Sequence, residues 1–160
     1  MKAQGITYDF VARDSNGCVV DRWTETNLVP DVGRDFIAEH GMTGANWYIG
    51  LFTANRYPIY QDTMATFIAD CAETSNYTSG ANSRIPLFGT LANGVYTNGS
   101  TPAVFSFTAS TSIAGGFVTN GAVRNTTDGV LLSVERNETV RVMGAGYNLT
   151  VVASIPVNTH

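Results

Sequence analysis

Charged side chains are scarce in this 160-residue chain. Asp, Glu, Lys and Arg make up 14% of it, against about 25% in an average globular domain. The net charge at pH 7 is −4, and the 9 basic residues are dispersed and include a single lysine, Lys2. Because a phosphate backbone is bound by a clustered basic face, this composition argues against nucleic-acid binding. A surface of Ser, Thr, Asn and Gly instead costs little to cover with a neighbouring molecule.

Histidine and cysteine are also rare, with two of each. A hydrolytic triad needs an imidazole between an acid and a nucleophile, but His160 is the last residue and His40 ends a predicted helix, where a cation is favoured. Cys18 and Cys71 are expected to be reduced, since no export signal accompanies them. With no His/Cys cluster and no calcium-loop motif, the sequence predicts no catalytic residue, no cofactor and no metal site.

Long apolar runs are missing as well. The longest, such as residues 129–134, fall far short of a membrane span, and the first residues lack the basic start and apolar stretch of a signal peptide. We therefore expect no membrane association.

Two groups of carboxylates are candidates for the catalytic acid pair of a glycosidase. They are Asp9 with Asp21, and Asp62 with Asp70 and Glu73. Arginines share the hairpin of the first pair, so ion pairing at the surface is the favoured interpretation, and the second group lies in an irregular segment. A carbohydrate-active enzyme remains an alternative on this basis.

Tight-turn signals are abundant. Asn or Asp followed by Gly adopts the positive φ angles of a two-residue hairpin with little strain. Five such pairs are candidate hairpin tips: Asn16-Gly17, Asn93-Gly94, Asn98-Gly99, Asn120-Gly121 and Asp128-Gly129.

Period-two alternation predicts strands between these turns. Residues 5–13 and 18–26 should form a hairpin, for which we favour a four-residue loop that pairs Asp9 with Arg22 and Tyr8 with Trp23. A two-residue loop would pair Tyr8 with Glu25 instead. Further strands are predicted at 46–53, 84–91, 94–97, 103–110, 112–119, 130–134, 139–143 and 147–157.

One helix is expected in an early connection, from Pro30 to His40, with Gly41 placed to end it. Gly33 weakens this helix, so packing must hold it. Eight or nine strands with one such helix predict a single all-β domain over residues 1–160, an antiparallel sandwich resembling a jelly roll, with an immunoglobulin-like sandwich as the second choice.

Residues 54–83 lose periodicity and form a long excursion, in which 62–70 could make a short helix. Ordering such a segment costs entropy, which is why long loops in compact domains are usually functional or held by a partner. Its tyrosines Tyr57, Tyr60 and Tyr77 are our candidate interface residues. Equally, they could pin the loop to its own domain. We expect the β domain to survive removal of this excursion.

The order of segments resembles that of a known family. The quoted stretches are Asn27-Leu-Val-Pro30, Trp47-Tyr-Ile-Gly-Leu-Phe52, Asp62-Thr-Met-Ala-Thr-Phe67, Arg84-Ile-Pro-Leu87, Val104-Phe-Ser-Phe107, Ile113-Ala-Gly-Gly-Phe117, Gly129-Val-Leu-Leu132 and Tyr147-Asn-Leu-Thr-Val151. From Asn27 onward the chain looks like the small capsid cement, or decoration, proteins of tailed double-stranded DNA bacteriophages. Residues 1–27, a hairpin or an arm that adds to a neighbour's sheet, are covered least.

The resemblance implies a structural virion protein made in the host cytoplasm and carried on the capsid exterior. Such a protein is a homodimer or homotrimer whose partner is the major capsid protein, and it stabilises contacts between capsid subunits without catalysis. A tail or fibre component, acting as a receptor-binding or adaptor module, is the alternative with the same fold and composition.

Overall fold

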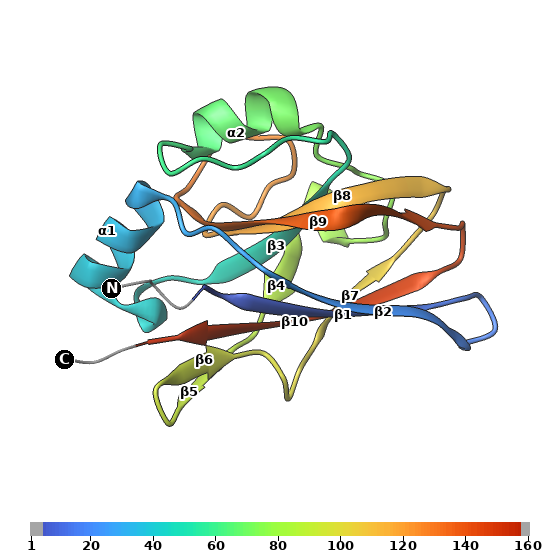
Figure 1. Cartoon of the computed structure of the whole chain (residues 1–160), viewed down its shortest axis with the longest axis horizontal. Helices are drawn as coiled ribbons and strands as arrows, with labels where there is room; N and C mark the ends of the chain where they lie inside the picture. Colours follow the sequence, from blue (N-terminus) through green and yellow to red (C-terminus); the bar gives the residue numbers. More distant parts are fainter. Residues whose placement is uncertain (1–4, 158–160) are drawn as a thin grey trace.

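The computed structural model describes residues 5–157 and shows two antiparallel sheets packed face to face (Figure 1). Sheet A has the order β2-β1-β10-β6-β5, with β7 also paired to β10, and sheet B has the order β4-β3-β8-β9. The strands of sheet A are β1 Thr7–Arg13, β2 Val19–Thr26, β5 Thr90–Ala92, β6 Val95–Thr97, β7 Ala103–Ser106 and β10 Asn148–Pro156. Those of sheet B are β3 Trp47–Phe52, β4 Ile85–Leu87, β8 Thr111–Thr119 and β9 Leu131–Met143. The predicted all-β antiparallel sandwich is confirmed.

The main core lies between the sheets and follows from alternation. In β10, Leu149, Val151, Ala153 and Ile155 are buried while their neighbours are half-exposed. In β3 both faces are buried, as apolar residues at every position predict. Sheet B is therefore an inner layer, covered by sheet A on one side.

Helix α1, Asp31–His40, forms where it was expected and packs on β9. Pro30 precedes it, and Gly41 at φ 69° ends it. A Cβ on Gly33 would lie 2.5 Å from the carbonyl oxygen of Leu132. Glycine thus weakens the isolated helix but lets it lie against the strand.

A second helix, α2, Met64–Cys71, covers the other face of sheet B (Figure 1). It buries a second core cluster that includes Phe67 against Phe52 and Phe117, with ring centroids 5.3 Å apart in both pairs. Residues 5–157 therefore hold two α-helices, beside the single-turn 3-10 helices Met42–Gly44 and Gly80–Asn82. The expectation of one helix fails in number, although the short helix within the excursion is confirmed.

This packing argues against the expectation that the β domain survives removal of the excursion, which stays a prediction. Without α2 the rings of Phe52 and Phe117, both 0% exposed, would face water. Burying an aromatic side chain contributes about 1.5–3 kcal/mol. The excursion is part of the fold.

Two of the five turn predictions hold. Asn16-Gly17 lies in the turn between β1 and β2, and Asn93-Gly94, with φ 51° and 74°, is the tip between β5 and β6. Asn98-Gly99 is not a hairpin tip, because β6 and β7 on either side of it both pair with β10 and not with each other. The buried Asn98 side chain donates to Val151 O and accepts from Ala153 N of β10. The other two pairs, Asn120-Gly121 and Asp128-Gly129, lie in the long connection from β8 to β9 rather than at a tip.

Register and strand limits also differ from the predictions. Tyr8 pairs with Glu25 and Phe10 with Trp23, so the favoured Asp9–Arg22 pairing is wrong. A bulge between Ala12 and Arg13 shifts the register by one residue, which gives the strands the pairing expected for the two-residue loop. Of the two alternatives for residues 1–27, the described part forms a hairpin, paired to β10 of its own sheet. The predicted strand 84–91 is split between the two sheets, whereas 130–134 and 139–143 belong to one strand.

Candidate interaction surface

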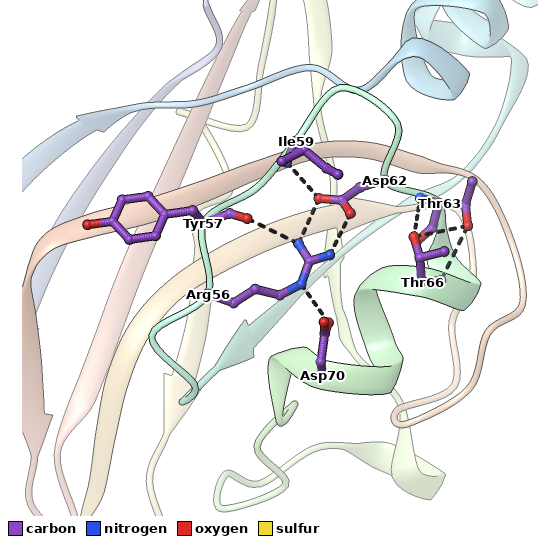
Figure 2. A network of polar contacts seen from close by, with 7 residues as sticks. All are labelled: Arg56, Tyr57, Ile59, Asp62, Thr63, Thr66 and Asp70. Carbon is purple, nitrogen blue, oxygen red and sulfur yellow. Dashed lines mark hydrogen bonds and ion pairs between the residues drawn. The ribbon is translucent and has the colours of Figure 1, made fainter.

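The first half of the excursion is held by one arginine. Arg56 donates from Nη1 and Nη2 to the two carboxylate oxygens of Asp62 at 2.7 and 2.6 Å, and from Nε to Asp70 at 2.5 Å (Figure 2). Its Cζ also lies 5.2 Å from the ring centroid of Phe67. A bidentate pair of this geometry fixes both position and orientation, so the loop from 56 to 62 is tied to α2.

Asp62 is 1% exposed, and burial alone would favour its neutral form. The hydrogen bonds from Arg56 and from the backbone N–H of Ile59 outweigh this effect and hold the pKa of Asp62 below its ordinary value of 3.8. The hydrogen bonds that Arg56 donates to Asp62 raise the pKa of Arg56 in turn. The pair is ionised over the whole neutral range.

Helix α2 begins at a capping box. The Thr63 hydroxyl accepts from Thr66 N, and the Thr66 hydroxyl accepts from Thr63 N (Figure 2). Two orphan donors of the first turn are satisfied in this way. The helix that anchors Arg56 therefore starts directly after Asp62.

Three apolar side chains stand out from this fixed loop, and together they form what we call the Tyr57 surface. Tyr57, Ile59 and Tyr60 are 68%, 52% and 55% exposed. The guanidinium Cζ of Arg136, on β9, lies 4.0 Å from the ring centroid of Tyr57, and that of Arg34, on α1, lies 5.6 Å from the ring of Tyr60. Large exposed aromatic groups held in place are typical of an interaction site.

Tyr77, the third predicted interface residue, lies elsewhere. It is 2% exposed, its ring packs against Phe105 at 4.8 Å, and its backbone bridges to Phe107. Tyr77 pins the end of the excursion to its own domain, so the structure brings together only Tyr57 and Tyr60 of the three candidates.

The far end of the excursion is held by a buried ion pair. Arg84 donates to both carboxylate oxygens of Glu73 at 2.8 and 2.9 Å, and both side chains are 0% exposed. Arg84 also donates to the carbonyl oxygens of Gly121 and Thr126, and Glu73 accepts from Asn125 N at 2.6 Å. This pair joins the excursion to the connection between β8 and β9.

The carboxylates weighed as acid pairs are engaged in such contacts. Asp62 and Asp70 meet only through Arg56, and Asp21 pairs with Arg141 at 3.0 Å. Among residues 5–157, no three His, Cys, Asp or Glu side chains gather as a metal site would require. Neither helix described here has the length and apolar composition needed to cross a bilayer.

Sequence reasoning missed Ile59 and the arginines around it. Ile59 lies in an aperiodic stretch, where no alternation reports which side chains face water. The spacing of Arg56, Asp62 and Asp70 contained a usable signal, because the last two lie on or beside a predicted short helix. Arg34 and Arg136 come from distant parts of the chain and could not be placed without the fold.

Replacing Arg56 with alanine should loosen the Tyr57 surface. The Asp62 carboxylate would keep only its bond from Ile59 N, which we expect to lower the free energy of unfolding by about 2 kcal/mol. Urea denaturation measures the loss, and amide exchange over residues 56–62 should accelerate. Arg34→Ala is the control: it breaks an exposed pair with Asp31 and should cost less than about 1 kcal/mol. Equal losses in the two variants would contradict the assignment.

Comparison of the chain with protein-family models, with curated proteins and with solved structures found no match.

Proposed function

We propose that this chain is a structural protein of a phage particle, which binds the capsid exterior through the Tyr57 surface and stabilises contacts between major capsid protein subunits. The observation that carries the proposal is a solvent-exposed aromatic surface held rigid by the Arg56 network. The likeness of the chain's segments to capsid cement proteins supplies the kind of partner.

The rigidity of the loop favours binding energetically. Ordering a loop on association costs about 0.5–1.5 kcal/mol of binding free energy for each side chain that is immobilised. Here Arg56, Asp62 and Asp70 already fix the backbone that carries Tyr57, Ile59 and Tyr60. Tyrosine contributes a large apolar area with a hydroxyl that can pair across an interface. Little of the contact energy is then spent on ordering the loop.

Binding of this kind stabilises a shell without chemistry. A protein that binds the assembled lattice better than separated subunits shifts the equilibrium toward the lattice by mass action. Many copies on a repeating surface, or several sites in one oligomer, add avidity to weak single contacts. A homodimer or homotrimer is the form we expect on the shell.

The proposal is tested by adding purified chain to capsid shells that lack it and measuring occupancy by co-sedimentation. Replacing both Tyr57 and Tyr60 with serine should weaken binding by at least about tenfold, as loss of interface tyrosines does. The free energy of unfolding should change by less than about 1 kcal/mol, because both rings are mostly exposed. Leu91→Ser, an apolar residue 50% exposed on β5, is the matched control and should bind normally.

Undiminished binding by the double variant would rule out the Tyr57 surface as the contact. A cryo-EM map of the particle tests the location separately. Density for this chain at regular positions on the head supports the cement function, whereas density confined to the tail would favour the tail or fibre alternative.

A further inference from the structure

A groove opens where the chain passes from sheet B to sheet A, between β4 and β5. Its volume is about 440 Å³, within the range of about 300–1,000 Å³ that is typical of small-molecule sites. The β6–β7 turn and the start of β3 form its other sides. It shares no residue with the Tyr57 surface.

The floor of this groove is apolar and aromatic. Trp47, Leu87 and Tyr96 line it and are each less than 9% exposed. The Tyr96 ring packs directly on the backbone of Gly89, where a Cβ would lie 2.3 Å from a ring carbon. Beside Gly89, Phe88 also lines the groove and is 66% exposed. An aromatic face is thus available to a ligand.

The rim is polar and neutral. Asn46, Thr90, Ser100 and Thr101 line it and are exposed, and they offer an amide and three hydroxyls that both donate and accept. In the described part of the chain, no residue that lines the groove carries a formal charge. A phosphate, carboxylate or ammonium group would lose its hydration there without gaining a counter-charge.

From these features we infer that the groove binds a neutral saccharide. The C–H face of a pyranose ring packs on an aromatic ring such as Phe88, while its hydroxyls pair with neutral amide and hydroxyl groups like those of Asn46 and Thr101. Since the lining offers no carboxyl group for the acid pair of a glycosidase, the site holds a sugar without cleaving it. This activity is separate from capsid attachment and does not depend on it.

The experiment is an NMR titration of the ¹⁵N-labelled chain with glucose, galactose and N-acetylglucosamine in turn, and with sodium phosphate as the charged comparison. At least one sugar should shift the amide signals of residues 86–90 and 100–101, and phosphate should not. Phe88→Ala should weaken that binding by about two- to tenfold, the effect of losing one aromatic contact. Tyr57→Ala removes a ring of nearly equal exposure elsewhere and should leave it unchanged.

Three results would overturn the inference: no shift in these amides with any of the sugars, a response to phosphate equal to that with sugar, or undiminished binding by Phe88→Ala. Dispersed amide signals in both variants establish that each is folded. Because the readout uses the chain alone, it is unaffected if the chain fails to bind capsids.

Discussion

Replacing Arg84 with methionine should lower the free energy of unfolding by about 3–5 kcal/mol, the cost of leaving a buried charge without its partner. Glu73 would keep only the hydrogen bond from Asn125 N, in a site where neither member of the pair is exposed. The carbonyl oxygens of Gly121 and Thr126 would lose a donor as well. Urea denaturation at neutral pH measures the loss.

A double variant separates the charge from the packing. In Arg84→Met with Glu73→Leu no charge is left buried, and replacing both members of a buried pair by apolar residues is often close to neutral. We therefore expect the double variant to be more stable than Arg84→Met alone. If the stability losses of the two single variants simply add in the double variant, the two side chains do not act as a pair.

The stability of the protein should fall as the pH rises from about 4.5 to 8, because of Glu135. This carboxyl is 0% exposed, in the core between the sheets; its Oε2 accepts from Gly116 N at 2.9 Å, and its Oε1 has no partner among residues 5–157. Burial, and to a smaller extent the charge of Glu25, raises the pKa of Glu135 to about 8. The Tyr8 hydroxyl, which is hydrogen-bonded to Ser133, lies nearby and stays protonated because burial raises its pKa too.

The sign follows from proton binding. Below pH 4.5 Glu135 is neutral in both states, so its pKa shift makes no contribution to stability. Above that value the unfolded chain ionises while the folded chain keeps its proton. A pKa of about 8 against 4.5 corresponds to roughly 4–5 kcal/mol lost by pH 8.

Glu135→Gln removes this dependence while keeping an acceptor for Gly116 N. The variant should match the wild type within about 1 kcal/mol near pH 4.5 and exceed it by about 4 kcal/mol near pH 8. Denaturation midpoints measured across this range check the difference between the two proteins. A difference in stability that stays constant with pH would mean that the protonation of Glu135 is not linked to folding. Asp62, whose pKa shift has the opposite sign, affects both proteins equally and does not change this difference.

Local patterns in the sequence predicted much of the fold. Alternation in residues 5–13 and 147–157 identified β1 and β10 and the faces they bury, and Pro30 with Gly41 bracketed α1. Two successive glycines are typical of a bulge or a close backbone approach, and at Gly115-Gly116 β8 shifts register, with the site of a Gly115 Cβ 2.1 Å from the carbonyl oxygen of Glu135.

Contacts between residues distant in the sequence explain the features that sequence patterns did not predict. The predicted strand 130–134 stopped before Glu135. A carboxyl is rarely buried, yet β9 continues through this position, where burial raises the pKa of Glu135, and Asn137 accepts a hydrogen bond from the Trp23 indole N–H. Of the three interface candidates Tyr57 and Tyr60 are exposed, whereas the burial of Tyr77 depends on Phe105 and Arg124, which are distant in sequence. Contacts between residues so far apart in the chain produce no periodic pattern in the sequence.

The excursion divides its tasks between two sets of side chains. Arg56, Asp62 and Phe67 face inward and secure the backbone, Asp70 binds Arg56 from the surface, and the side chains at positions 57, 59 and 60 face solvent. Substitutions at positions 57, 59 and 60 should therefore change the stability of the fold very little. Under the proposed function, a lineage of such proteins could exchange these exposed residues and adapt to a new counterpart while keeping the same scaffold.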